Sequence, residues 1–85
     1  GIYPVGTVVI LDTFEVAIVA GPGSNHEELH RPLVRIVIGA DGSTLPAPGE
    51  LADLSLMNAE GVYPRTIVKV TSADRYGIVV GDYFV

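Results

Sequence analysis

The chain has 85 residues, and ten acidic against five basic side chains give it a formal net charge of −5 at pH 7. This charge repels a phosphate backbone, which excludes nucleic acid as the expected partner. The chain has no cysteine, which excludes disulfides and thiolate chemistry, and no apolar run near the length of about 20 residues that a membrane-spanning helix needs. We therefore expect a cytoplasmic protein with neither a nucleic-acid nor a membrane partner.

Short runs of β-branched residues, separated by glycine, proline and aspartate, predict an all-β chain. The five expected strands cover residues 7–11, 15–20, 33–38, 50–54 and 66–71. Asp12-Thr13-Phe14 joins the first two strands into a hairpin, and the Asp41-Gly42 pair predicts a tight turn after the third. Loops are expected at residues 45–49 and 58–64, and a turn or a single helical turn at residues 73–77.

Five short strands in a single domain of residues 1–85 favour a small closed or half-closed barrel, because closure leaves no free strand edge. An SH3-like barrel is the first expectation, and an OB-like barrel is the second. No internal repeat or linker divides the chain.

Residues 25–32, NHEELHRP, contain the H-E-x-x-H pattern of zinc peptidases. On a helix His26 and His30 share one face, where both can ligate zinc while Glu27 acts as general base. Ser24 and Glu27 fit a capping box that would start such a helix, and Pro32 would end it. A hydrolytic zinc also needs a third protein ligand, and the chain has no third histidine. We therefore interpret the segment as an exposed loop without bound metal, and keep a metal site at His26 and His30 as the alternative.

The four tyrosines are a second candidate site. Tyr3, Tyr63, Tyr76 and Tyr83 would form an aromatic surface for a peptide or a base if they gathered on one face. Basic residues are not interleaved with them, which favours tyrosines that cap the core and keep the hydroxyl at the surface. The carboxylates are spread singly along the chain, so we expect no acid/base pair.

Several segments together resemble the small domain at the carboxyl end of HD-GYP proteins, which are cyclic di-GMP phosphodiesterases. They are YPVGTVV (residues 3–9), VAIV (16–19), RPLVR (31–35), Asp53-Leu54, IVKV (67–70), YGI (76–78) and Asp82-Tyr83. The match spans nearly the whole chain, although Asp12-Thr13-Phe14 stands where the family places glycines.

The resemblance implies an accessory domain of a larger bacterial phosphohydrolase, and the parent protein would be a metal-dependent phosphodiesterase of cyclic di-GMP signalling. Its catalytic residues cannot be carried over, because the chain contains neither a His-Asp doublet nor a Gly-Tyr-Pro tripeptide. We therefore expect no enzyme activity and no cofactor in this chain. The expected partner is the catalytic domain of the parent protein or a second copy, and the alternative is an independent barrel that binds a peptide or a protein.

The first hairpin is apolar on both of its faces, and this bears on the expected partner. A small barrel has one interior, so its other apolar face is either covered or exposed as an interface. The residues expected at this interface are Val8, Ile10, Ala17 and Val19. The alternative is that residues 78–80 and 83–85 cover this face within the monomer.

Overall fold

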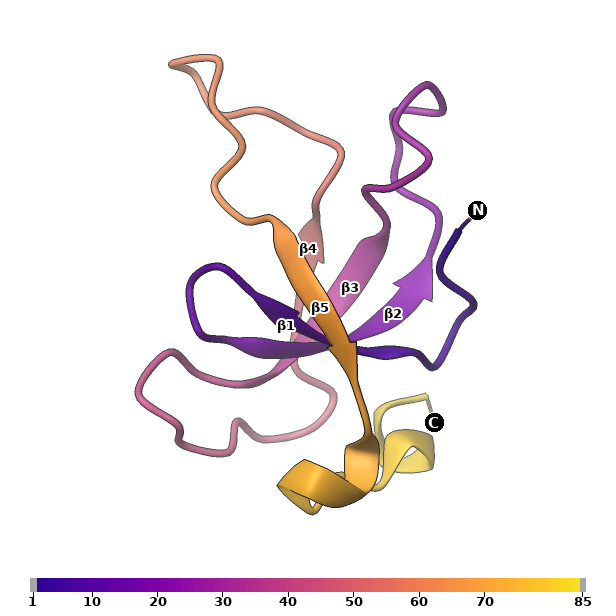
Figure 1. Ribbon diagram of the computed structural model, residues 1–85, viewed down its shortest axis with the longest axis vertical. Coiled ribbons are helices and arrows are strands. Elements are labelled where there is room, and N and C mark those ends of the chain that lie inside the picture. The colour runs from indigo at the N-terminus through magenta and orange to yellow at the C-terminus, as the bar shows by residue number, and fades with distance from the viewer. Residues whose placement is uncertain (1, 85) are drawn as a thin grey trace.

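A computed structural model describes residues 2–84, which form one antiparallel sheet (Figure 1). The five strands are β1 (Val8–Leu11), β2 (Val16–Gly21), β3 (Leu33–Ile38), β4 (Glu50–Asp53) and β5 (Ile67–Thr71). They are ordered β4-β3-β2-β1-β5, so the first and last strands of the chain are neighbours. The prediction of an all-β chain with five strands is confirmed. Within residues 2–84 no ladder joins β4 to β5, and the sheet is not closed.

The central strands β1, β2 and β3 are buried on both faces of the sheet, as the two-sided apolar hairpin requires, whereas Val68 and Val70 of β5 are exposed. One cluster contains Val9 and Leu11 of β1 together with residues of β2, β3 and β4, and Tyr3 and Ile67 pack against it. The second cluster contains Val8, with residues of β2 and β3. Alternation along a strand places successive side chains on opposite faces, which explains the division into two clusters.

Two short 3-10 helices cover the second face: η1 (Ala73–Tyr76) and η2 (Val80–Tyr83). Tyr83 is 8% exposed and belongs to the second cluster, and Tyr76, Ile78 and Val80 pack against the same cluster. The helices lie beside one end of the sheet in Figure 1. The expected covering segment 83–85 includes Val85, which lies outside the described residues. None of the helices within residues 2–84 is long and apolar enough to cross a bilayer.

The four residues expected at an interface do not form one surface. Val9 pairs with Ala17 and Val8 with Ile18, so Ala17 and Val19 lie on the opposite face from Val8 and Ile10. Val8 is 3% exposed, Ala17 and Val19 are fully buried, and Ile10 is half-buried. The hairpin register explains why the four residues are divided between the two faces. The carboxyl-terminal helices explain why the face with Val8 is buried. The structure agrees with the alternative expectation on the face with Val8, where Ile78, Val80 and Tyr83 cover the hairpin within the monomer.

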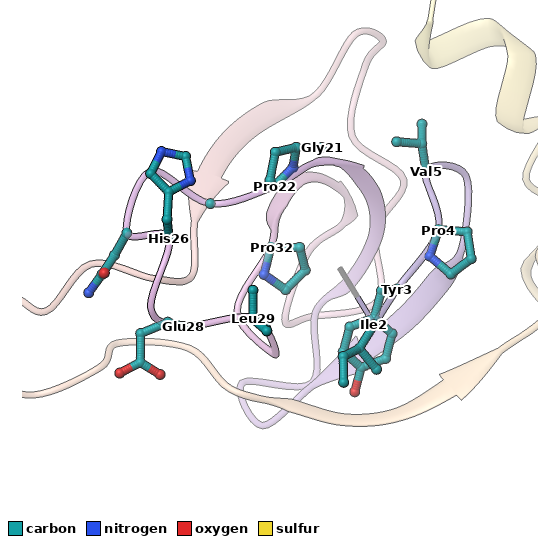
Figure 2. A pocket seen from close by; sticks show the side chains of 12 residues that line it. Ile2, Tyr3, Pro4, Val5, Gly21, Pro22, His26, Glu28, Leu29 and Pro32 are labelled. Atoms are coloured by element: carbon teal, nitrogen blue, oxygen red, sulfur yellow. The ribbon is translucent and has the colours of Figure 1, made fainter.

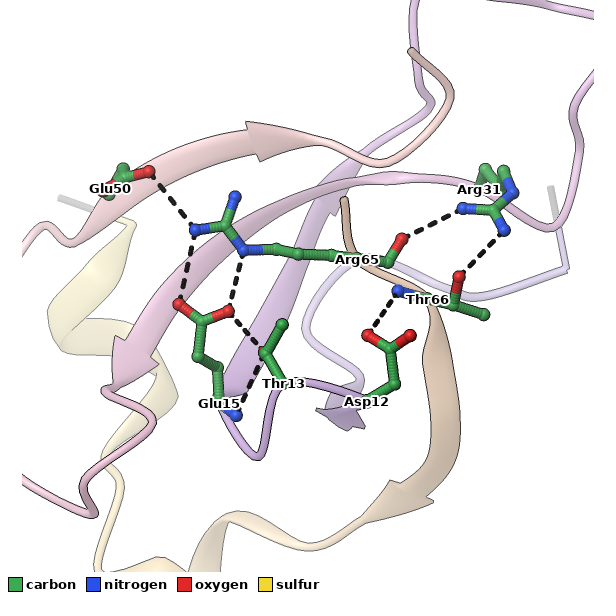
Figure 3. Close-up of polar contacts among 7 residues, drawn as sticks. All are labelled: Asp12, Thr13, Glu15, Arg31, Glu50, Arg65 and Thr66. Carbon is green, nitrogen blue, oxygen red and sulfur yellow. Dashed lines mark hydrogen bonds and ion pairs between the residues drawn. The ribbon is translucent and has the colours of Figure 1, made fainter. Parts of the chain in front are cut away.

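Two arginines connect the edge strands β4 and β5 (Figure 3). Arg31 Nη1 donates to the carbonyl oxygen of Leu54, which follows β4, at 3.1 Å and to that of Arg65, which precedes β5, at 3.0 Å. Its Nη2 donates to Thr66 Oγ1 at 3.0 Å. Arg65 Nη2 lies 3.7 Å from a carboxylate oxygen of Glu50, the first residue of β4. Side chains therefore hold together two strands that no backbone ladder joins.

Candidate functional site

Residues 22–32, which contain the H-E-x-x-H pattern, form turns between β2 and β3. The amide of Glu28 donates to the carbonyl of Asn25, and the amide of Arg31 to that of Glu28, each at 3.1 Å. These are i to i+3 bonds of two successive turns, whereas an α-helix requires i to i+4 bonds. Asn25 Oδ1 accepts the amide of Glu27, the donor that the expected Ser24 cap would have used. The alternative of a helix over residues 25–31 is therefore wrong, and the loop interpretation is the one that the fold supports.

The turns separate the two histidines. His26 lines a groove beside the amino-terminal segment, whereas His30 lines a smaller depression with Arg31 and Thr66. Across residues 2–84 no group of three or more histidine or carboxylate side chains is placed to hold a metal ion.

The loop is fixed to the end of β4 by polar contacts. The amide of Ser24 donates to Asp53 Oδ2 at 3.0 Å, and the amide of Asn25 donates to Ser55 Oγ at 3.0 Å. Burial raises the pKa of Asp53, but hydrogen bonds from Ser24 and Ser55 outweigh it and lower the pKa to about 2. Gly23 is required here, because an added Cβ would lie 2.4 Å from the carbonyl oxygen of Arg31.

Arg31 also stacks on Tyr63, which extends the same contact network to the loop before β5. The guanidinium carbon lies 3.5 Å from the centre of the Tyr63 ring, a cation–π geometry. Tyr63 Oη donates to Glu28 Oε1 at 3.2 Å. Desolvation and the Glu28 carboxylate raise the pKa of Tyr63, so its hydroxyl keeps the proton that it donates. The sequence indicates Tyr63 only as one of four candidate aromatic residues. Its contacts with Arg31 and Glu28 could not be predicted, since they join segments more than 30 positions apart.

A groove lies between the amino-terminal segment and this loop (Figure 2). We call it the N-terminal groove; its volume is about 310 Å³. Its lining residues are Ile2, Tyr3, Pro4, Val5, Gly21, Pro22, Gly23, Asn25, His26, Glu28, Leu29 and Pro32. In Figure 2 the side chains of Ile2, Tyr3, Pro4 and Val5 stand on one side, and His26 and Glu28 lie at the other. Val5 and Leu29 are each 61% exposed, so apolar surface is accessible here.

The tyrosines do not gather on one face. Tyr3 packs against the first cluster, Tyr76 and Tyr83 belong with the second, and Tyr63 stacks on Arg31. Three of the four therefore take the core-capping role that the sequence favours. Of these residues only Tyr3 lines the N-terminal groove.

The remaining polar cluster stabilises the hairpin and the start of β5. Arg65 Nε pairs with Glu15 Oε1 at 2.7 Å, and Thr13 donates its hydroxyl to the same oxygen (Figure 3). The Arg65 hydrogen bond lowers the pKa of Glu15 against an opposing effect of burial. A general acid requires a raised pKa, and the carboxyls of Glu15, Asp41 and Asp53 all have lowered ones. These groups hold their charge and organise the loops.

Comparison of the chain with protein-family models, with curated proteins and with solved structures gives no match. Functional assignment therefore rests on the geometry of the groove and on the residues around it.

Proposed function

We propose that this chain is a non-catalytic interaction domain, and that the N-terminal groove is its binding surface. The observation that carries the proposal is the accessible apolar lining of a cavity of about 310 Å³, beside a sheet whose central strands are buried on both faces. Apolar cavities of this size are the usual location of a ligand. The perturbed carboxyls and Arg31 are engaged in structural hydrogen bonds, which favours binding over catalysis.

The proposed architecture is a half-closed, SH3-like barrel. The strand order supports this assignment, because β5 pairs with β1 and leaves β4 and β5 as the two edges that a barrel would bring together. The arginine contacts between the β4 and β5 edges support it as well.

The biological context that we propose is an accessory domain of a larger, HD-GYP-type phosphohydrolase, on the resemblance of segments such as residues 3–9 and 31–35. The domain would then pack on the catalytic domain or on a second copy, in a bacterial cytoplasm. Cyclic di-GMP is expected not to bind this chain itself, because Arg31 already donates to three protein oxygens.

An independent peptide- or protein-binding module is the second candidate. The N-terminal groove favours it, since the apolar lining is available without any further domain.

The proposal is tested by titrating the isotopically labelled chain with the rest of its natural protein and following the amide NMR signals. We expect the largest shifts at groove residues, and we expect Val5→Asp to abolish them. Val79→Asp is the matched control, because Val79 is 62% exposed, close to the 61% of Val5, and does not line the groove. Shifts that are confined to other surfaces, or an equal effect of both variants, would contradict the assignment.

A further inference from the structure

The N-terminal groove has an uneven distribution of charge. Among its twelve lining residues there is one carboxylate, Glu28, and there is no lysine or arginine. The apolar side chains of Val5, Leu29 and Pro22 line the same groove. An occupant that satisfies this surface must therefore combine an apolar group with a positive charge.

Glu28 is held in place and is left with capacity to bind. Its Oε1 accepts the Tyr63 hydroxyl at 3.2 Å, which fixes the position of the carboxylate. The nearby cation, Arg31, stacks on the ring of Tyr63. Its guanidinium donates hydrogen bonds to Leu54, Arg65 and Thr66. Across residues 2–84 no ion pair within 4.0 Å involves Glu28. The carboxylate therefore keeps acceptor positions for a ligand.

Three of the twelve lining residues are prolines, which have no backbone N–H, and the side chains of Tyr3, Asn25 and His26 supply donors. Glu28 is the lining residue with a free carboxylate acceptor. Lysine and arginine side chains carry only donors, so they complement the free acceptor positions of Glu28. The net charge of −5 also attracts a cationic segment over a longer range.

We propose that the N-terminal groove binds an extended peptide segment in which an apolar residue stands next to a lysine or an arginine. The apolar side chain lies against Val5, Leu29 and Pro22, and the cation pairs with the Glu28 carboxylate. This inference rests on the proposed function and specifies its ligand. A second copy of the chain is a less suitable occupant, because acidic residues outnumber basic ones two to one in each copy.

The test uses a random peptide library selected against the purified chain, followed by calorimetry with one selected peptide. We expect the selected sequences to share an apolar residue beside a lysine or an arginine. Glu28→Gln is expected to bind the peptide roughly tenfold more weakly, the usual effect of losing one charge-assisted hydrogen bond. Gln retains an oxygen that can accept the Tyr63 hydroxyl, so the variant should fold normally.

Glu27→Gln is the matched control, because Glu27 is the adjacent exposed residue, carries the same charge and does not line the groove. It is expected to leave the affinity unchanged. Replacing the basic residue of the peptide by norleucine, which keeps the apolar chain and removes the charge, should reproduce the effect of Glu28→Gln.

Four results would overturn the inference. Selected peptides without a basic residue, or equal affinities for the Glu27 and Glu28 variants, would remove the role of charge. If Val5→Asp still abolished binding in that case, the proposed function would stand with a different ligand. Peptides that shift signals only outside the groove would overturn both, and a wild type that dimerises through the groove in sedimentation would assign the surface to a second copy.

Discussion

Phe14 occupies a backbone conformation that favours glycine. Its φ is 72°, and it is the only non-glycine residue with a positive φ among those that the structure describes. The amide of Phe14 donates to the Leu11 carbonyl, and the amide of Leu11 donates to that of Glu15, which closes a tight hairpin with Phe14 in the left-handed position. Such a position is usually glycine in this type of hairpin. The ring is also 80% exposed, so little packing offsets the strain.

The cost can be separated into two parts. A left-handed conformation costs a residue with a Cβ roughly 1–2 kcal/mol, and glycine gives back about 0.5–1 kcal/mol through its greater freedom in the unfolded chain. The buried fifth of the ring, out of about 200 Å², contributes at most about 1 kcal/mol at 25 cal/mol/Å². Phe14→Ala loses the ring contacts and retains the strain, whereas Phe14→Gly loses both.

We therefore expect the Gly variant to be about 1 kcal/mol more stable than the Ala variant, and close to the wild type. In a domain of this size that difference corresponds to roughly 4–8 °C in Tm. Urea denaturation of the wild type, Phe14→Ala and Phe14→Gly, fitted with one common m-value, measures the difference in the free energy of unfolding. Equal stabilities for the Gly and Ala variants, or a more stable Ala variant, would refute the assignment of backbone strain to Phe14.

Three further predictions concern polar groups. Calorimetric titration with zinc at neutral pH is expected to show no submicromolar site, and a tight site abolished by His26→Ala or His30→Ala would refute the loop interpretation. Asp53 has a pKa of about 2 in the fold against an ordinary value of 3.8, so its stabilisation is present above pH 4 and is lost as the pH falls from about 4 to about 2. Asp53→Asn should lower the free energy of unfolding by about 1 kcal/mol at pH 7 and remove this part of the acid transition, which denaturation at several pH values would reveal. The folded pKa of Glu15 is lowered too, so its pairing with Arg65 stabilises the fold above pH 4.5 and weakens below it. Arg65→Gln should cost about 1 kcal/mol at pH 7 and progressively less in acid, and a loss independent of pH would point to packing instead.

The strands could be predicted from the sequence because their signal is local. β-branched runs between turn residues gave all five strands within a residue or two, and the Asp41-Gly42 turn is present, with Gly42 at φ 87°. The turn or helical turn expected at residues 73–77 corresponds to η1, which ends at Gly77 in the left-handed conformation. Because these interactions are short in range, each strand or turn can be predicted from its own segment of the sequence.

The groove could not be predicted in the same way, since it depends on long-range contacts. Asp53 and Ser55 position the loop from about 30 residues away, and no pattern near residues 22–32 indicates them. The separation of Ala17 from Val8 follows from strand register, which a one-residue shift would reverse. Phe14 was visible in the sequence as a departure from the glycines of similar hairpins, but its left-handed conformation required the hairpin geometry.

The segment NHEELHRP has a role that does not depend on its two histidines. Glu28 and Arg31 stand three residues apart, and the turn between them brings both to Tyr63. Arg31 also donates hydrogen bonds to the carbonyl oxygens of Leu54 and Arg65, and these bonds connect the edge strands β4 and β5, which no ladder joins. The same turn leaves part of the Glu28 carboxylate beside the groove. One short loop thus fixes the open edge of the sheet and places a charge at the proposed binding surface, and these two roles account for its acidic and basic residues.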